Sequence, residues 1–171
     1  MRRYLTGWLL KTATLALLCA ATAVSAQTAS PPAEGEDVFK VVWHVDFPEP
    51  RRLSALIQNV NNMVTTLQGT LTDYDVRIVF LAGGVRFLTE DPLKGTPFEA
   101  DEAFLRQRPE LLQRLQQLRT LHDVKFEVCE ITLEQLGLPK ERIVEGVPSV
   151  RSGVVRIAEL QQHGYAYLKV E

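Results

Sequence analysis

Cysteine is scarce in this chain of 171 residues, which contains two, Cys19 and Cys129. Histidine is almost as rare, and His44, His122 and His163 are scattered along the sequence. Structural zinc sites take Cys and His ligands at short, regular spacings, so these residues predict no metal centre. Phosphate-binding loops, the G-x-G-x-x-G fingerprint and the G-x-S-x-G nucleophile elbow are also missing. The sequence therefore gives no support for a nucleotide or metal cofactor, and we expect none.

An apolar run long enough to span a membrane is missing as well. The run near the N-terminus, residues 12–23, has about a dozen residues where a spanning helix needs roughly 20. Three basic residues precede it and the small residues 24-VSA-26 follow it, which is the layout of a secretory signal peptide. We expect residues 1–26 to be a signal peptide cleaved after Ala26. The mature chain would then be periplasmic or secreted, without a membrane span.

Positive charge is not in excess either. The chain has 19 Lys and Arg against 21 Asp and Glu, and the predicted signal peptide removes three basic and no acidic residues, which takes the net charge from −2 to about −5. An acidic protein is poorly suited to bind nucleic acid. Cys19 leaves with the signal peptide, so no intramolecular disulfide can form. Cys129 would be an unpaired thiol in an oxidising compartment, which is unusual.

The remaining sequence predicts a tether followed by one α/β domain. Residues 27–37, QTASPPAEGED, are polar and contain two adjacent prolines, which is typical of a flexible tether. Residues 38–171 are long enough to bury a core. β-branched and aromatic runs predict strands at 38–45, 74–82, 124–129, 144–150 and 165–170. Amphipathic stretches between them predict helices at 50–69, from Asp101 onward with Pro109 in the first turn, at 131–136 and at 152–162. This alternation favours a parallel sheet covered on both faces.

In open α/β sheets, ligands bind beyond the carboxyl ends of the strands. We therefore predict one binding edge formed by residues that follow the first four strands. These residues are His44, Asp46, Gly83, Gly84, Cys129, Ser152 and Gly153.

Cys129 could act in two ways. At the start of a helix its thiolate would be stabilised by free backbone N–H groups, although the adjacent Glu130 opposes this with its negative charge. Alternatively, Cys129 is a small buried hydrophobic residue. The role of His44 is equally open. It could accept a proton from the thiol, orient a ligand, or simply pack at the end of its strand. An exposed thiol of low pKa would favour the first interpretation of Cys129, and a fully buried one the second.

Several segments resemble the exported branch of the DsrE/DsrF-like sulfur-relay family. These segments are 44-HVD-46, 57-IQNVNNMV-64, 78-IVFLAGG-84, 126-FEVCEITLEQLGL-138 and 150-VRSGVVRIAELQQHGYAYLKV-170. The resemblance implies a three-layer α/β/α fold with a five-stranded, mostly parallel sheet in a flavodoxin-like arrangement. It also implies a homo-oligomer, a trimer or a hexamer.

The resemblance further implies that Cys129 accepts sulfane sulfur as a persulfide and exchanges it with a sulfur donor or acceptor protein. The alternative is a non-catalytic ligand-binding or assembly module in which Cys129 is structural.

Overall fold

The computed structural model describes residues 38–171. The signal peptide and tether predicted for residues 1–37 lie outside the described residues. The strands are β1 (Phe39–Val45), β2 (Tyr74–Phe80), β3 (Lys125–Cys129), β4 (Ser149–Val150) and β5 (Ala166–Lys169). The helices are α1 (Pro50–Gly69), α2 (Glu102–His122), α3 (Glu130–Leu136) and α4 (Gly153–Gln162), with 3-10 helices η1 (Ala82–Leu88) and η2 (Lys140–Arg142). Among these helices none is long and apolar enough to cross a membrane.

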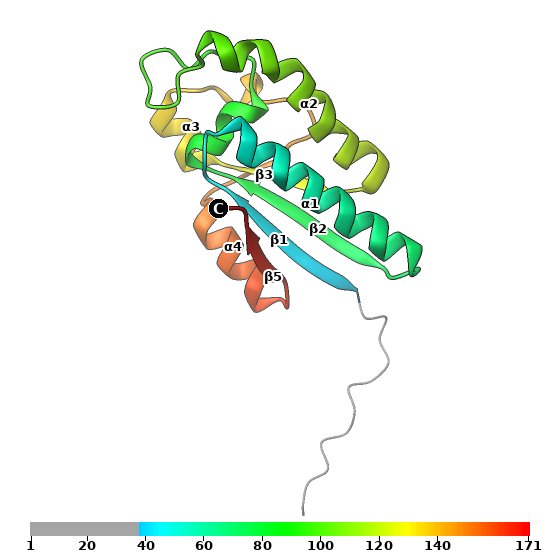
Figure 1. Ribbon diagram of the computed structural model, residues 1–171. Helices are drawn as coiled ribbons and strands as arrows, with labels where there is room; N and C mark the ends of the chain where they lie inside the picture. Colours follow the sequence, from blue (N-terminus) through cyan, green and yellow to red (C-terminus); the bar gives the residue numbers. More distant parts are fainter. Residues whose placement is uncertain (1–37) are drawn as a thin grey trace, which may run out of the picture. The chain divides into compact units, whose positions relative to one another are not determined.

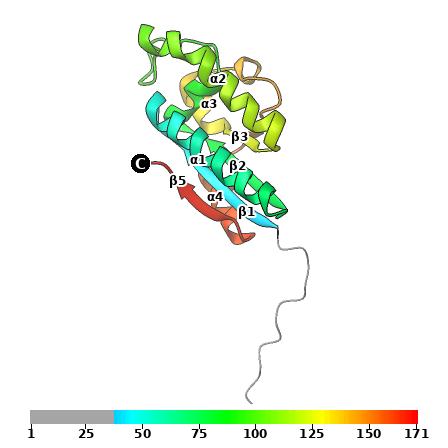
Figure 2. The same cartoon turned by 45° about the vertical axis from the view of Figure 1, so that its right-hand side comes forward.

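The five strands form one sheet in the order β4-β3-β2-β1-β5, and each neighbouring pair is parallel. Figures 1 and 2 show α1 and α2 on one face of this sheet and α4 on the other. The predicted α/β fold with three layers and a five-stranded parallel sheet is confirmed. The strand order differs from the flavodoxin order 2-1-3-4-5, because here the chain crosses to the other side of β1 only for its last strand.

The two faces of the sheet are packed unequally. Alternate strand residues such as Trp43, Ile78 and Phe126 join side chains of α1, α2 and α3 in one large apolar core. The opposite face has a small cluster of four buried residues, Val42, Val79, Ile157 and Leu160, beneath α4. α4 is therefore held to the sheet by little apolar contact.

The predicted start of β4 and the predicted position of Pro109 are wrong for identifiable reasons. β4 contains only two residues, because the segment before it bonds elsewhere: Val144 N–H donates to Leu88 O at 2.8 Å, and Ile143 forms an antiparallel bridge with Thr89. Pro109 lies inside α2 and not in its first turn. The helix begins at Glu102, next to the predicted Asp101, whose carboxylate caps it by accepting a hydrogen bond from Phe104 N–H at 2.7 Å.

Gly83 and Gly84 permit close backbone packing at the carboxyl edge of the sheet. A Cβ atom on Gly83 would lie 2.8 Å from Pro48 Cδ, and one on Gly84 would overlap with the carbonyl oxygen of Val45. Both glycines are buried in η1 against the connection from β1 to α1. The structure thus gives this pair a packing role.

We predict that Gly84→Ala destabilises the protein by about 1–3 kcal/mol, because the added methyl group must displace the backbone of β1. Urea unfolding followed by circular dichroism measures the effect. Gly69→Ala is the matched control, since a methyl group on Gly69 would have no neighbouring atom within 4 Å and alanine in a helix gains up to about 1 kcal/mol over glycine. Equal stability of Gly84→Ala and the wild type would contradict the packing role.

Candidate functional site

Cys129 is the last residue of β3 and the N-cap residue of α3. Phe126 and Val128 belong to the large core, so the alternating side chains of Glu127 and Cys129 point to the face covered by α4. Cys129 is a free cysteine and is only 5% exposed. The sulfur thus lies between the start of α3 and the start of α4.

The starts of α3 and α4 both lie against Cys129. Burial by itself raises the pKa of Cys129. This effect is outweighed by the backbone N–H of Gly153 at the start of α4, by the N–H groups of Thr132 and Ile131 in α3, and by the Thr132 hydroxyl. The pKa of Cys129 therefore lies below that of an ordinary thiol, although the sulfur is buried.

Thr132 connects the sulfur to a neighbouring loop. Its hydroxyl oxygen accepts a hydrogen bond from Ala82 N–H at 3.1 Å, and the hydroxyl contributes to the lowered pKa of Cys129. The side chain of Thr132 is buried. We did not predict Thr132 as a site residue, although a threonine three positions after a cysteine that precedes a helix is a usable signal.

The charge of Glu130, expected to oppose the thiolate, is bound by other groups. Its carboxylate pairs with Lys140 and accepts a hydrogen bond from Ser149 Oγ at 2.8 Å, and Arg151 lies 3.9 Å away. The bonds from Lys140 and Ser149 lower the pKa of Glu130. The negative charge next to Cys129 is thus compensated by two cations.

Ser152 and Gly153 place the start of α4 against the sulfur. Ser152 caps the helix, since its Oγ accepts from Val155 N–H at 3.4 Å. A Cβ atom on Gly153 would lie 3.2 Å from both Cys129 Cβ and Leu81 Cδ2, closer than most carbon contacts. Only glycine lets the helix backbone come this near to Cys129.

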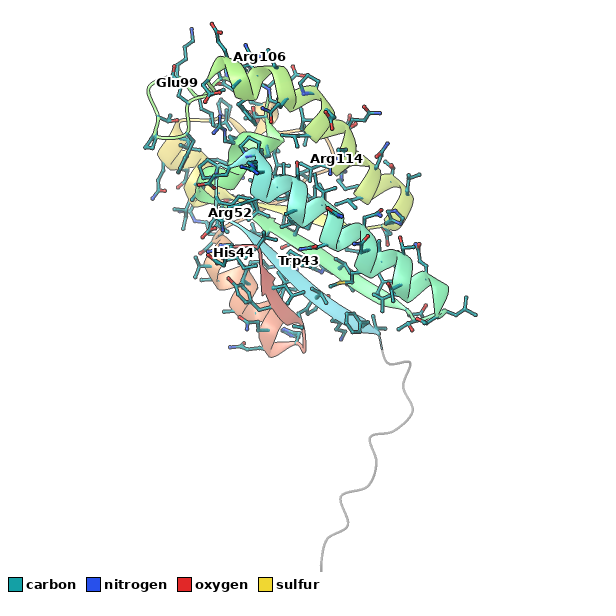
Figure 3. All side chains as sticks on the ribbon, in the orientation of Figure 1. Trp43, His44, Arg52, Glu99, Arg106 and Arg114 are labelled. Atoms are coloured by element: carbon teal, nitrogen blue, oxygen red, sulfur yellow. The ribbon has the colours of Figure 1, made fainter. Side chains whose placement is uncertain are left out.

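His44 and Asp46 form a separate cluster at the ends of β1 and β5. His44 Nδ1 bonds the Tyr167 hydroxyl at 2.8 Å, and Asp46 Oδ2 accepts from Lys169 Nζ at 2.9 Å. His44 Nε2 lies 3.7 Å from the Asp46 carboxylate. Figure 3 marks His44 on β1, next to Trp43, whose side chain alternates to the other face. Burial lowers the pKa of His44, so the ring is neutral near pH 7.

The predicted edge residues thus separate into three groups. Cys129, Ser152 and Gly153 lie together, whereas Gly83 and Gly84 pack under the β1–α1 connection. His44 is two strands away from Cys129 because β2 lies between β1 and β3, a distance on the order of 10 Å. Within residues 38–171, no three His, Cys, Asp or Glu side chains are grouped as ligands of a metal ion.

Comparison with protein families gives a match to the DsrE/DsrF-like family over residues 52–170. This chain belongs to that family. Among solved structures, the DsrE-like fold is shared with MTH1491 of Methanobacterium thermoautotrophicum, a protein of unknown function. That chain is 27% identical, with a TM-score of 0.59 over 77% of this chain and 98% of its own. The YchN protein of E. coli is 16% identical, with a TM-score of 0.46 over 77% and 99% of the two chains. Comparison with curated proteins gives no match.

We predict that Thr132→Val slows alkylation of Cys129 at neutral pH in this DsrE-like protein, because the thiolate loses a hydrogen bond. The substitution should also cost about 1–3 kcal/mol of stability, because the N–H of Ala82 loses its acceptor. Alkylation by iodoacetamide across a pH series, together with urea unfolding, measures both effects. Thr120→Val is the control, since that exposed hydroxyl bonds only Gln116 O. An unchanged pH profile in Thr132→Val would exclude the hydroxyl as a partner of the sulfur.

Proposed function

We propose that this protein carries sulfane sulfur as a persulfide on Cys129. Membership of the DsrE/DsrF-like family suggests a function of sulfur-relay type. The observation that supports Cys129 as the carrier is its set of hydrogen-bond donors from α3 and α4, which favour the thiolate despite burial. The thiolate, and not the thiol, is the nucleophile in sulfur exchange.

The transfer consists of two exchange steps. The Cys129 thiolate attacks a sulfur atom of a polysulfide or of a donor protein's persulfide, and a new S–S bond forms at Cys129 as the S–S bond of the donor breaks. The electron pair of the broken bond leaves with the donor thiolate or the shortened polysulfide. An acceptor thiolate then attacks the outer sulfur of the persulfide, and the Cys129 thiolate is the leaving group. The two steps balance without an added oxidant or reductant.

A second candidate function is a ligand-binding or assembly module in which Cys129 only packs. The observation that favours it is the 5% exposure of Cys129. Val79 of β2 and Leu81, which follows that strand, lie beside Gly153 at the same place, so the surroundings of the sulfur are partly apolar. Burial and a lowered pKa point to different functions, and the reactivity of the thiol in the native protein separates them.

We predict that native protein incubated with polysulfide gains mass in steps of one sulfur atom, because the thiolate is stabilised by the helix N–H groups. Cys129→Ser should gain no mass while it keeps the circular dichroism spectrum of the wild type. Mass spectrometry of the intact protein measures the change. Treatment with a small thiol reductant should remove the added mass, as expected for a persulfide.

A thiol-labelling control separates the carrier from the packed cysteine. The native thiol should react with a small reagent such as methyl methanethiosulfonate, and more slowly with a bulky maleimide, because the sulfur is nearly covered. Labelling by the small reagent only after unfolding would refute the carrier function and leave the binding or assembly module.

We also propose that the mature protein is exported to the periplasm or secreted and is a homo-oligomer. The layout of residues 1–26 supports export. Two apolar side chains exposed on α4, Val154 at 65% and Val155 at 55%, support assembly, because adjacent exposed apolar residues are typical of contact surfaces.

We predict that the mature protein sediments as a trimer or a hexamer. Analytical ultracentrifugation of residues 27–171 at micromolar concentrations measures the mass. The double substitution Val154→Lys with Val155→Lys should shift the distribution toward the monomer if α4 takes part in the contact. A wild-type protein that remains a monomer at tens of micromolar would exclude this assembly.

A further inference from the structure

A buried carboxylate joins α4 to the sheet two residues before Cys129. Glu127 on β3 is 4% exposed, and its two oxygens accept three charged hydrogen bonds. Arg156 of α4 donates Nε–H to Oε2 at 2.6 Å and a terminal N–H to Oε1 at 2.9 Å. Arg77 of β2 donates to Oε1 at 2.8 Å. Such bidentate pairs fix both distance and orientation.

The cluster extends to the connection between α4 and β5. Arg77 also donates to Asp75 at 2.9 Å and to the Tyr165 hydroxyl at 3.1 Å, and that hydroxyl donates to Asp75 at 2.8 Å. Burial raises the pKa of Glu127, but the bonds from Arg156 and Arg77 outweigh burial and lower it. Glu127 is thus ionised, and both ends of α4 are linked to the sheet by charged groups.

Sequence spacing aligns this ion pair with the sulfur contact. Glu127 and Cys129 are two positions apart on β3, so both side chains point to the same face of the sheet. Gly153 and Arg156 are three positions apart on α4, so both face the sheet from the same side of the helix. The ion pair therefore joins the same two elements that meet where Gly153 packs against Cys129.

We propose that Glu127 and Arg156 are positioning residues for Cys129. Their bidentate ion pair holds the first turn of α4 over the end of β3 and thereby keeps the Gly153 N–H on the sulfur. The role is needed because only Ile157 and Leu160 of α4 enter the small apolar cluster on this face. The functional meaning of the inference rests on the proposed use of Cys129 as a sulfur carrier, but the geometry can be tested without any sulfur donor.

The substitution Glu127→Gln separates a positioning role from a purely electrostatic one, because the two predict opposite changes in the rate of Cys129 alkylation. Removing a negative charge near Cys129 stabilises the thiolate and should speed alkylation. Losing the bidentate pair loosens α4, withdraws the Gly153 N–H and should slow alkylation. We expect a severalfold slower reaction with iodoacetamide at pH 7, and a pH–rate profile displaced to higher pH.

Glu130→Gln is the matched control. Glu130 is directly next to Cys129, but its carboxylate contacts Lys140, Ser149 and Arg151, none of which belongs to α4. This variant should react faster than the wild type, since it removes a negative charge beside Cys129 and breaks no contact with α4. The positioning role is overturned if Glu127→Gln also reacts faster or keeps the wild-type profile.

A second variant covers the case in which Glu127→Gln does not fold. Arg156→Lys keeps the positive charge but replaces the bidentate guanidinium contact to Glu127 with a single ammonium group. It should fold, as judged by circular dichroism, and should show the same displacement of the pH–rate profile in smaller measure. A wild-type profile in Arg156→Lys would contradict the proposal. Because alkylation needs no sulfur donor, failure of polysulfide loading and failure of positioning are separate results.

Discussion

The contact between the start of α4 and the sulfur of Cys129 is the constraint on which the site depends. A thiolate at 5% exposure is unfavourable unless hydrogen bonds replace the lost water. N–H groups at the starts of α3 and α4 and the Thr132 hydroxyl outweigh burial and lower the pKa of Cys129. Two of these N–H groups come from α3, which follows β3 directly. The Gly153 N–H is different, because its distance from the sulfur depends on how α4 packs on the sheet.

The two faces of the sheet differ in the way that this packing of α4 beside Cys129 requires. The large core beneath α1, α2 and α3 is apolar, and its packing specifies the fold. Beneath α4 the sheet carries the charged side chains of Arg77 and Glu127, which an apolar cluster could not accommodate. Buried ion pairs add little net stability compared with apolar packing, but they are specific in geometry. The face that holds the sulfur is thus ordered by charged hydrogen bonds, and the opposite face supplies the stability.

Local sequence patterns predicted the elements well where one periodicity continued without interruption. α1 begins at Pro50 and ends at Gly69, as its apolar spacing and terminal glycine indicated. The start of β4 could not be predicted, because the preceding residues are apolar enough for a strand but bond to Leu88 and Thr89, which are distant in the sequence. α2 begins next to Asp101, as predicted, but Pro109 lies inside the helix and not in its first turn, because the Asp101 cap sets the start of the helix well before the proline.

The rule that ligands bind beyond the carboxyl ends of parallel strands placed Cys129, Ser152 and Gly153 at one edge of the sheet. This rule needs only the order of the strands along the sequence. The rule could not tell which of these edge residues lie close together, because that depends on the order of the strands within the sheet, β4-β3-β2-β1-β5. His44 and Asp46 are therefore distant from the thiol and bond Tyr167 and Lys169 instead. Thr132 was missed because its role requires the approach of Ala82 from another loop.

The glycines of the carboxyl edge bear on what such a site can hold. Glycines at this edge often form a cradle for phosphate groups, but the space beside Gly84 and Gly153 is filled by neighbouring protein atoms, from Val45 in one case and from Cys129 and Leu81 in the other. These two glycines therefore leave no open cradle for a phosphate group. The cargo proposed for Cys129 needs no such cradle, because a persulfide adds a single sulfur atom to the side chain.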